Sequence, residues 1–228
     1  MCTLTWSRSG PDKLEVWFNR DEKKARPIAD SPSQRLLDGV SFLSPRDPQG
    51  GGTWMIANEF GVVVCLLNKW ELDSTSAQGR RKSRGQLVWR MATARSVDNL
   101  VSFLTELENY PAFTLVGISA EGERFWEWDG ETLSETEAAM PLTSSSYCFD
   151  AVKAAREDVF AAGKRGHHFH EASGEEPSTF TVRMNRPDAQ TWSRSHVTVG
   201  EKVTWEYLAE QPDLAGEPER VLLDLPLK

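Results

Sequence analysis

The chain has 228 residues, a length that suits one domain with a sizeable buried core. Hydrophobic residues make up 39 % and charged residues 26 % of it, a balance that excludes an intrinsically disordered chain. Lys and Arg number 26 against 34 Asp and Glu, and the resulting net charge of −8 argues against a nucleic-acid partner, because an acidic surface repels phosphates.

The longest apolar run, residues 62–67, is far shorter than the roughly 20 residues that cross a bilayer. The amino terminus lacks the basic start and long apolar middle of a secretion signal. We therefore expect no membrane span and a cytoplasmic location. The three cysteines, Cys2, Cys65 and Cys148, are widely spaced and form no CxxC pair, which indicates neither a disulfide framework nor a metal site.

The first third of the chain reads as two β-hairpins. Residues 3–7 and 14–18 are strand-like and flank a turn, and residues 53–58 and 62–68 repeat this pattern. Between the hairpins, residues 26–48 contain several prolines and few periodic apolar positions. This segment is predicted to be a long irregular excursion.

Helices and strands then alternate in blocks. Helical periodicity follows Ser83 and Ser96, strand patterns come next, and one further helix precedes two closing strands. This order favours an α+β fold with largely antiparallel sheets covered by helices. The predicted elements are helices at 84–94 and 97–108, strands at 113–119 and 124–129, a helix at 150–162, and strands at 193–199 and 203–208.

The position of Cys2 suggests a chemical role. Methionine aminopeptidase removes Met1 when the next side chain is small, and Cys2 would then be the first residue of the mature chain. A terminal cysteine has its own base, because its α-amino group has a pKa of about 7.7 to 8.0. From this residue alone, a chance cysteine or a small strand residue is the favoured alternative.

A charged cluster ends the second predicted strand, which should pair with the strand that carries Cys2. The cluster FNRDE places Asn19, Arg20, Asp21 and Glu22 at this point. An arginine beside a thiolate lowers the thiol pKa, and an aspartate can hold an α-ammonium group. A solvated turn is the alternative for such a cluster.

The stretch FNRDEKKARP resembles the signature of the NRDE family, also called the transport and Golgi organisation family, whose members begin Met-Cys. The stretches GGTWMIANEFGVVVCLLNKW, KSRGQLV and RPDAQTWSRS extend the resemblance over most of the chain. The family has the fold of the N-terminal-nucleophile (Ntn) hydrolases. The resemblance therefore implies one domain over residues 1–228, built as a four-layer αββα sandwich of two largely antiparallel sheets.

A more distant resemblance implies site residues. The segment ANEFGVVVCLLN is similar to a pattern in the choloylglycine hydrolases, the bile-salt and penicillin V acylases. Carried over, Cys2 is the nucleophile, Asp21 orients its amine and Arg20 helps to form the thiolate. Asn68 is the side-chain oxyanion donor, and Asn58 reads as a turn residue.

The chain departs from the acylases at one position. TSSSYCFD stands where they have a TNNP stretch, so Ser144 replaces an asparagine that assists the oxyanion site. Loss of one such donor can lower turnover by about 100-fold or more. The acylases also have a late arginine, for which Arg183, Arg186 and Arg194 are candidates. Ligand contacts are expected from Asn19, Glu22, Trp54, Ser144 and Arg194.

Histidines and tryptophans supply further candidates. His167, His168 and His170 could ligate a metal or haem iron, but a solvated basic loop is the favoured interpretation. Trp126 and Trp128 are expected to cover core. Trp17 and Trp54 are better placed in sequence to line a pocket.

Members of the family are associated with intracellular haem mobilisation and, in eukaryotes, with lipid and mitochondrial metabolism, and no hydrolase reaction is established for them. We therefore expect the chain to bind a hydrophobic ligand, with haem as cargo and haem-acceptor proteins as partners. No cofactor is required. Cys2-dependent hydrolysis of a C–N bond in a small acyl-amide is the alternative function.

Overall fold

The computed structural model describes residues 2–10, 13–70, 82–176, 178–210 and 218–228. The predicted removal of Met1 lies outside the described residues. No helix in these ranges is both long and apolar enough to cross a membrane.

The first sheet contains both ends of the described chain. Its described strands run in the order β10-β1-β2-β11-β12-β13, and every neighbouring pair is antiparallel. A register shift on β11 between Thr191 and Ser193 interrupts its pairing with β2. The strands are β1 (Cys2–Arg8), β2 (Leu14–Lys23), β10 (Leu142–Ser144), β11 (Ala189–Val199), β12 (Lys202–Ala209) and β13 (Glu219–Pro226).

The second sheet is an antiparallel meander in which each strand pairs with the next along the chain, from β3 to β9. Short turns join most of these strands, whereas residues 69–112, which include the helical turns of residues 84–109, lie between β6 and β7 along the chain. The strands are β3 (Asp30–Leu37), β4 (Val40–Arg46), β5 (Met55–Asn58), β6 (Val63–Asn68), β7 (Phe113–Ile118), β8 (Glu123–Trp128) and β9 (Leu133–Thr136).

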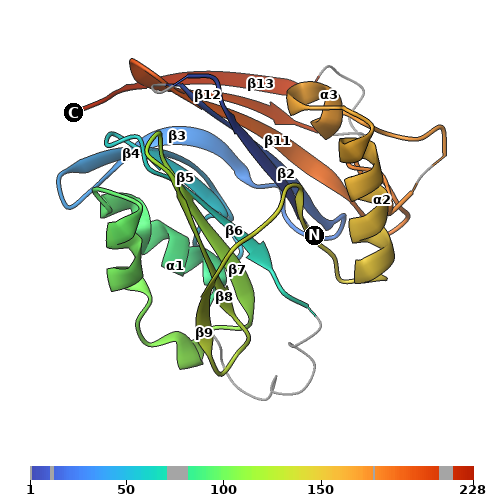
Figure 1. The fold of residues 1–228 in the computed structure, drawn as a ribbon, viewed down its shortest axis with the longest axis horizontal. Helices are drawn as coiled ribbons and strands as arrows, with labels where there is room; N and C mark the ends of the chain where they lie inside the picture. The colour runs from blue at the N-terminus through green and yellow to red at the C-terminus, as the bar shows by residue number, and fades with distance from the viewer. Residues whose placement is uncertain (1, 11–12, 71–81, 177, 211–217) are drawn as a thin grey trace.

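Helices cover the outer face of each sheet, as Figure 1 shows for the α-helices. On the seven-stranded sheet, buried residues of α1 and η1 pack against the outward side chains of β5 and β6. On the six-stranded sheet, α3 contacts β1 and β2, and α2 contacts β10. The helices are α1 (Arg84–Arg90), α2 (Phe149–Ala161) and α3 (Gly166–His170), with 3₁₀ helices η1 (Met91–Thr93), η2 (Asp98–Phe103) and η3 (Leu107–Asn109).

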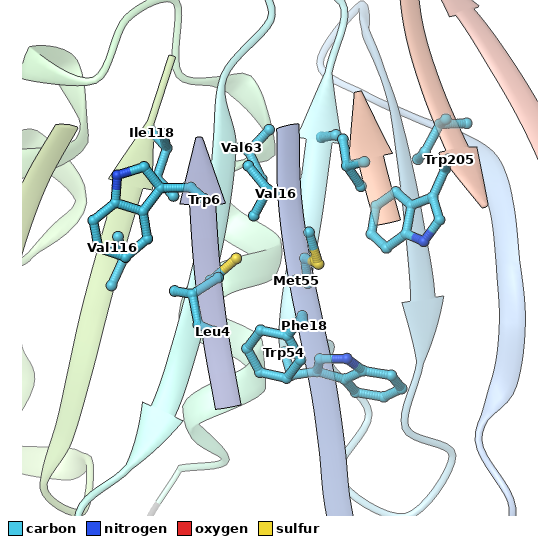
Figure 2. Packing of buried hydrophobic residues seen from close by; sticks show 14 of the residues in the cluster. Leu4, Trp6, Val16, Phe18, Trp54, Met55, Val63, Val116, Ile118 and Trp205 are labelled. Carbon is cyan, nitrogen blue, oxygen red and sulfur yellow. The ribbon is translucent and has the colours of Figure 1, made fainter. Parts of the chain in front are cut away.

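The main hydrophobic core lies between the two sheets. Leu4, Val16 and Phe18 from the first sheet enter the same space as Met55 and Val63 from the second (Figure 2). Strand side chains alternate between faces, so one face of each sheet supplies this core, and helices pack against part of the other face. The predicted α+β fold, a four-layer αββα sandwich, is confirmed.

Two predicted segments were wrong. Residues 26–48 form the hairpin β3–β4, which turns at Asp38 and Gly39, both with positive φ. An Asp-Gly pair is a strong hairpin signal, and Pro32 is tolerated because β3 is an edge strand with an irregular register.

The predicted helix at 97–108 consists of short 3₁₀ turns instead. Glu106, with a left-handed φ of 57°, lies between η2 and η3 and interrupts the helical turns. The segment lies very close to β7, because a Cβ on Gly117 would come within 2.2 Å of Leu100. The other predicted helices and strands are present, whereas β9, β10, α3 and β13 were not predicted.

Candidate functional site around Cys2

Cys2 begins β1, and its neighbours in the sheet define the site. It pairs with Arg20 on β2 and with Ser144 on β10. Its side chain is 8 % exposed and belongs to the cluster between the sheets. Cys2 and Arg20 line a cleft of about 370 Å³. Strand pairing thus brings three of the predicted site residues together.

The four-residue cluster at the end of β2 is divided between the two faces of the sheet, because successive strand side chains alternate. Arg20 and Glu22 line the cleft together with Trp54. The Arg20 guanidinium lies over the Trp54 ring, 4.4 Å from its centroid, and its Nη2 is 3.7 Å from Glu22 Oε2. Arg20 is therefore held against an aromatic wall beside the thiol.

Asn19 and Asp21 are bound on the helix side. Asn19 Nδ2 donates to the backbone oxygen of His170 at 2.9 Å. Asp21 accepts hydrogen bonds from Arg156 Nη2 at 3.1 Å and from Thr191 Oγ1 at 2.6 Å. Asp21 borders the cleft, but the structure does not place Asn19, a predicted ligand contact, with the cleft residues.

Charged residues surround the open part of this cleft. Arg26 contacts Asp47 at 2.5 Å and Glu22 at 3.6 Å. Lys82 and Arg84 line the cleft from the segment that enters α1. The cleft is thus lined by carboxylates and by several cationic side chains together.

Burial raises the pKa of the Cys2 thiol above its ordinary value, and the Asp21 carboxylate acts in the same direction. The Arg20 guanidinium and a backbone N–H of Asp21 lower the thiol pKa, but burial outweighs them. The thiol is therefore protonated at neutral pH.

A second cleft of about 500 Å³ adjoins the first, and Asn68 and Trp70 line both. Asn68 ends β6, a strand that contacts β1 and β10. Ser144 lines the second cleft, and its buried Oγ has no hydrogen-bond partner among the described residues. The other lining residues include Ala138, Ala139, Pro141, Leu142 and Phe149.

The three candidate late arginines lie outside both clefts. Arg194 binds Glu210 at 2.8 Å and Glu171 at 2.6 Å, and Arg183 also contacts Glu210. Arg186 pairs with Asp188 at 2.7 Å. Each of these guanidinium groups forms an ion pair with an acidic side chain and does not line the clefts near Cys2.

Trp17 and the histidines also lie away from Cys2. Trp17 stacks on His196 with ring centroids 4.6 Å apart, and both line a different pocket together with His167 and His170. The His170 ring bonds Thr5 Oγ1 and Asn19 Oδ1 at 2.8 Å each. Burial lowers the pKa of His170 to about 3, so this ring is neutral and structural.

Three arginines in the site region were missed by sequence reasoning. Arg26 and Arg84 follow no pattern that distinguishes them from surface arginines. Arg156 gave a usable signal, because it lies four positions after Val152 on the buried face of α2. A charged residue on an apolar helix face indicates a buried partner.

Asn58 has the expected turn role, since its Oδ1 accepts the backbone N–H groups of Phe60 and Val62. Trp126 and Trp128 belong to a core cluster. Within the part of the chain that the structure describes, no three His, Cys, Asp or Glu side chains are grouped to hold a metal ion.

The fold is shared with solved hydrolases. A mutant of conjugated bile acid hydrolase from Clostridium perfringens, with cysteine replaced by alanine, superposes with a TM-score of 0.57 at 13 % identity, over 98 % of this chain and 92 % of that one. An arginine-to-leucine variant of conjugated bile acid hydrolase from the same organism gives 0.55 at 12 % identity, over 97 % and 92 %. This chain therefore has the Ntn-hydrolase fold.

The family follows from the sequence itself. The model of the family described as Transport and Golgi organisation 2 (TANGO2) matches residues 1–151 of the 228. The chain belongs to this family, and the resemblance drawn from FNRDEKKARP is confirmed. No curated protein matches the chain.

Proposed function

We propose that the cleft beside Cys2 binds a small hydrophobic ligand that carries carboxylates, and that this ligand is haem in transit to acceptor proteins. The observation that carries the proposal is the Arg20 guanidinium lying over the Trp54 ring next to the thiol. This pair offers an aromatic wall and a fixed cation within one cleft.

The charge pattern fits such a ligand. Arg26 and Arg84 line the same cleft as Arg20, and guanidinium groups bind carboxylates by directed hydrogen bonds. The adjoining cleft is lined in part by small apolar side chains and Phe149. An amphipathic molecule would place its acidic groups near the arginines and its apolar body toward the second cleft.

Cys2 is the candidate iron ligand, because His167, His168, His170 and His196 all lie outside the two clefts. The raised pKa of the thiol means that a proton must leave when sulfur binds iron. Haem affinity should therefore be moderate and rise with pH, which suits a protein that passes its cargo on.

A second function, hydrolysis of an acyl-amide, has its own supporting observation: Asn68 lines the cleft that contains Cys2 and also the cleft that contains Ser144. In this reaction the Cys2 sulfur attacks the carbonyl carbon and its proton is transferred to the leaving amine. Water then cleaves the thioester to release the acid. Asn68 would stabilise the oxyanion.

Haem titration followed by the Soret band tests the first proposal. We expect saturable one-to-one binding, weakened about 10- to 100-fold in Arg20→Gln as one charge-assisted contact is lost. Cys2→Ala should change the position of the Soret band. Arg194→Gln is the matched control, because its guanidinium pairs with Glu171 and Glu210 away from the clefts, and it should bind like the unmodified protein.

The same preparations, incubated with a panel of acyl-amides, decide between the two functions. Saturable haem binding without amine release supports trafficking. Amine release that depends on Cys2, together with weak and non-saturating haem association, would overturn it and establish the hydrolase.

A further inference from the structure

Arg156 is a fully buried arginine that belongs to neither cleft. It lies on α2, and its side chain is 0 % exposed. The guanidinium reaches two strands of the six-stranded sheet: Nη1 donates to Thr3 Oγ1, and Nη2 donates to Asp21 Oδ2 at 3.1 Å. A buried guanidinium is stable only when its charge and its donors are matched, and both strands contribute to this match.

These contacts fall directly behind the Cys2 site. Thr3 follows Cys2 on β1, and Asp21 follows Arg20 on β2, while Cys2 and Arg20 are themselves paired. Because the strands are antiparallel, Thr3 lies opposite Asn19, and Thr3 and Asp21 flank the Cys2–Arg20 pair on opposite sides. Arg156 therefore spans this pair diagonally and ties the two strands together behind it.

A third strand completes the arrangement. Thr191 of β11 donates to the other oxygen of Asp21 at 2.6 Å. The Asp21 carboxylate is thus held from α2 and from β11 and has a fixed orientation. Its negative charge disfavours the Cys2 thiolate. A guanidinium bound to a carboxylate weakens the field of that carboxylate at a neighbouring group, and Arg156 is bound to Asp21 in this way.

We propose that Arg156 is a positioning residue for Cys2: by binding Thr3 and Asp21 it fixes the start of β1 and the carboxylate behind the thiol. The role goes beyond the proposed function, because it applies whether the cleft stores a ligand or cleaves one. Its test needs no ligand, so its failure is distinguishable from failure of haem binding.

The test measures alkylation of Cys2 by iodoacetamide against pH, with peptide mass mapping of the modified sites. Cys148 is exposed and is the N-cap residue of α2, so its rate reports any general loosening of that helix. The variants are Arg156→Gln, Arg156→Lys and the double variant Arg156→Gln/Asp21→Asn. Arg165→Gln is the matched control, since Arg165 is exposed and bonds only backbone oxygens of Phe160 and Lys164 among the described hydrogen bonds.

In Arg156→Gln the midpoint for Cys2 alkylation should move upward by about half to one pH unit, because the Asp21 charge is no longer offset. Arg156→Lys should shift it less, and the double variant should return it to the original value or below. Cys148 should react as before in every variant.

Two outcomes would overturn the proposal. One is a Cys2 profile in Arg156→Gln identical to that of Arg165→Gln. The other is an equal change at Cys2 and Cys148, which would mean that Arg156 only anchors α2. If Arg156→Gln does not fold, the double variant decides: recovery of folding supports the pairing with Asp21, and its absence contradicts it.

Discussion

Cys2 and Arg20 are direct partners across the β1–β2 ladder, and both side chains enter the same cleft. The relationship is set by the register of one hairpin, so it does not depend on a contact between distant segments. It gives the thiol a fixed cation and an aromatic neighbour, Trp54, on one side.

Replacing Arg20 should make the Cys2 thiol less acidic. Arg20 lowers the pKa of Cys2, so in Arg20→Gln the pH at which alkylation reaches half its maximal rate should rise. Arg20→Lys should retain part of the effect. A pH profile identical to that of Arg194→Gln would show that Arg20 does not affect the pKa of the Cys2 thiol.

Trp54 should contribute to stability as well as to the wall of the cleft. Its side chain is 7 % exposed and belongs to the core between the sheets. Trp54→Ala should lower the free energy of unfolding by about 3 to 5 kcal/mol, measured by urea denaturation. Trp54→Phe, which keeps an aromatic ring, should lose less. Equal losses in the two variants would contradict a packing role for the ring.

Acid should destabilise the fold through His170. Burial lowers its pKa from 6.5 to about 3, so the unfolded chain binds the proton more readily than the folded chain. Stability from this group is complete above pH 6.5 and is lost as the pH falls toward 3. Between pH 7.5 and pH 5 the loss should be about 2 kcal/mol.

Urea denaturation of the unmodified protein and of two histidine variants, at pH 7.5 and at pH 5, tests this predicted loss of stability. In His170→Gln the loss of unfolding free energy between pH 7.5 and pH 5 should be smaller by about 2 kcal/mol. The variant should be less stable than the unmodified protein at both pH values, because it loses two buried hydrogen bonds. His168→Gln, an exposed neighbour, should keep the original slope. An unchanged slope in His170→Gln would assign the acid sensitivity to other groups.

Removal of Met1 remains a prediction. A small second residue permits it, and only the processed chain has an α-amino group on Cys2. Intact-mass measurement of protein made with normal processing should give the mass of the chain without one methionine. A retained methionine would rule out the Cys2 amine as a base in the alternative hydrolysis.

The local parts of the site were predictable from sequence. Apolar alternation located the first hairpin, and a hairpin necessarily brings its two strands into contact. The pattern alone therefore placed FNRDE beside the strand of Cys2. The same reasoning missed β3 and β4. The prolines within residues 26–48 suggested an irregular segment, and the Asp-Gly turn signal between the two strands was not used.

The tertiary structure decided which side chains share a cleft. Arg156 contacts Asp21 from 135 positions away, and Ser144 reaches Cys2 only because β10 joins the edge of β1. Composition and periodicity determined that this chain forms two-faced strands and amphipathic helices, with the charged cluster and Cys2 on neighbouring strands. The packing of helices and sheets determined that Arg194 pairs with glutamates elsewhere while Asp21 is held by Arg156, because contacts between distant segments depend on how the layers stack and leave no local pattern in the sequence.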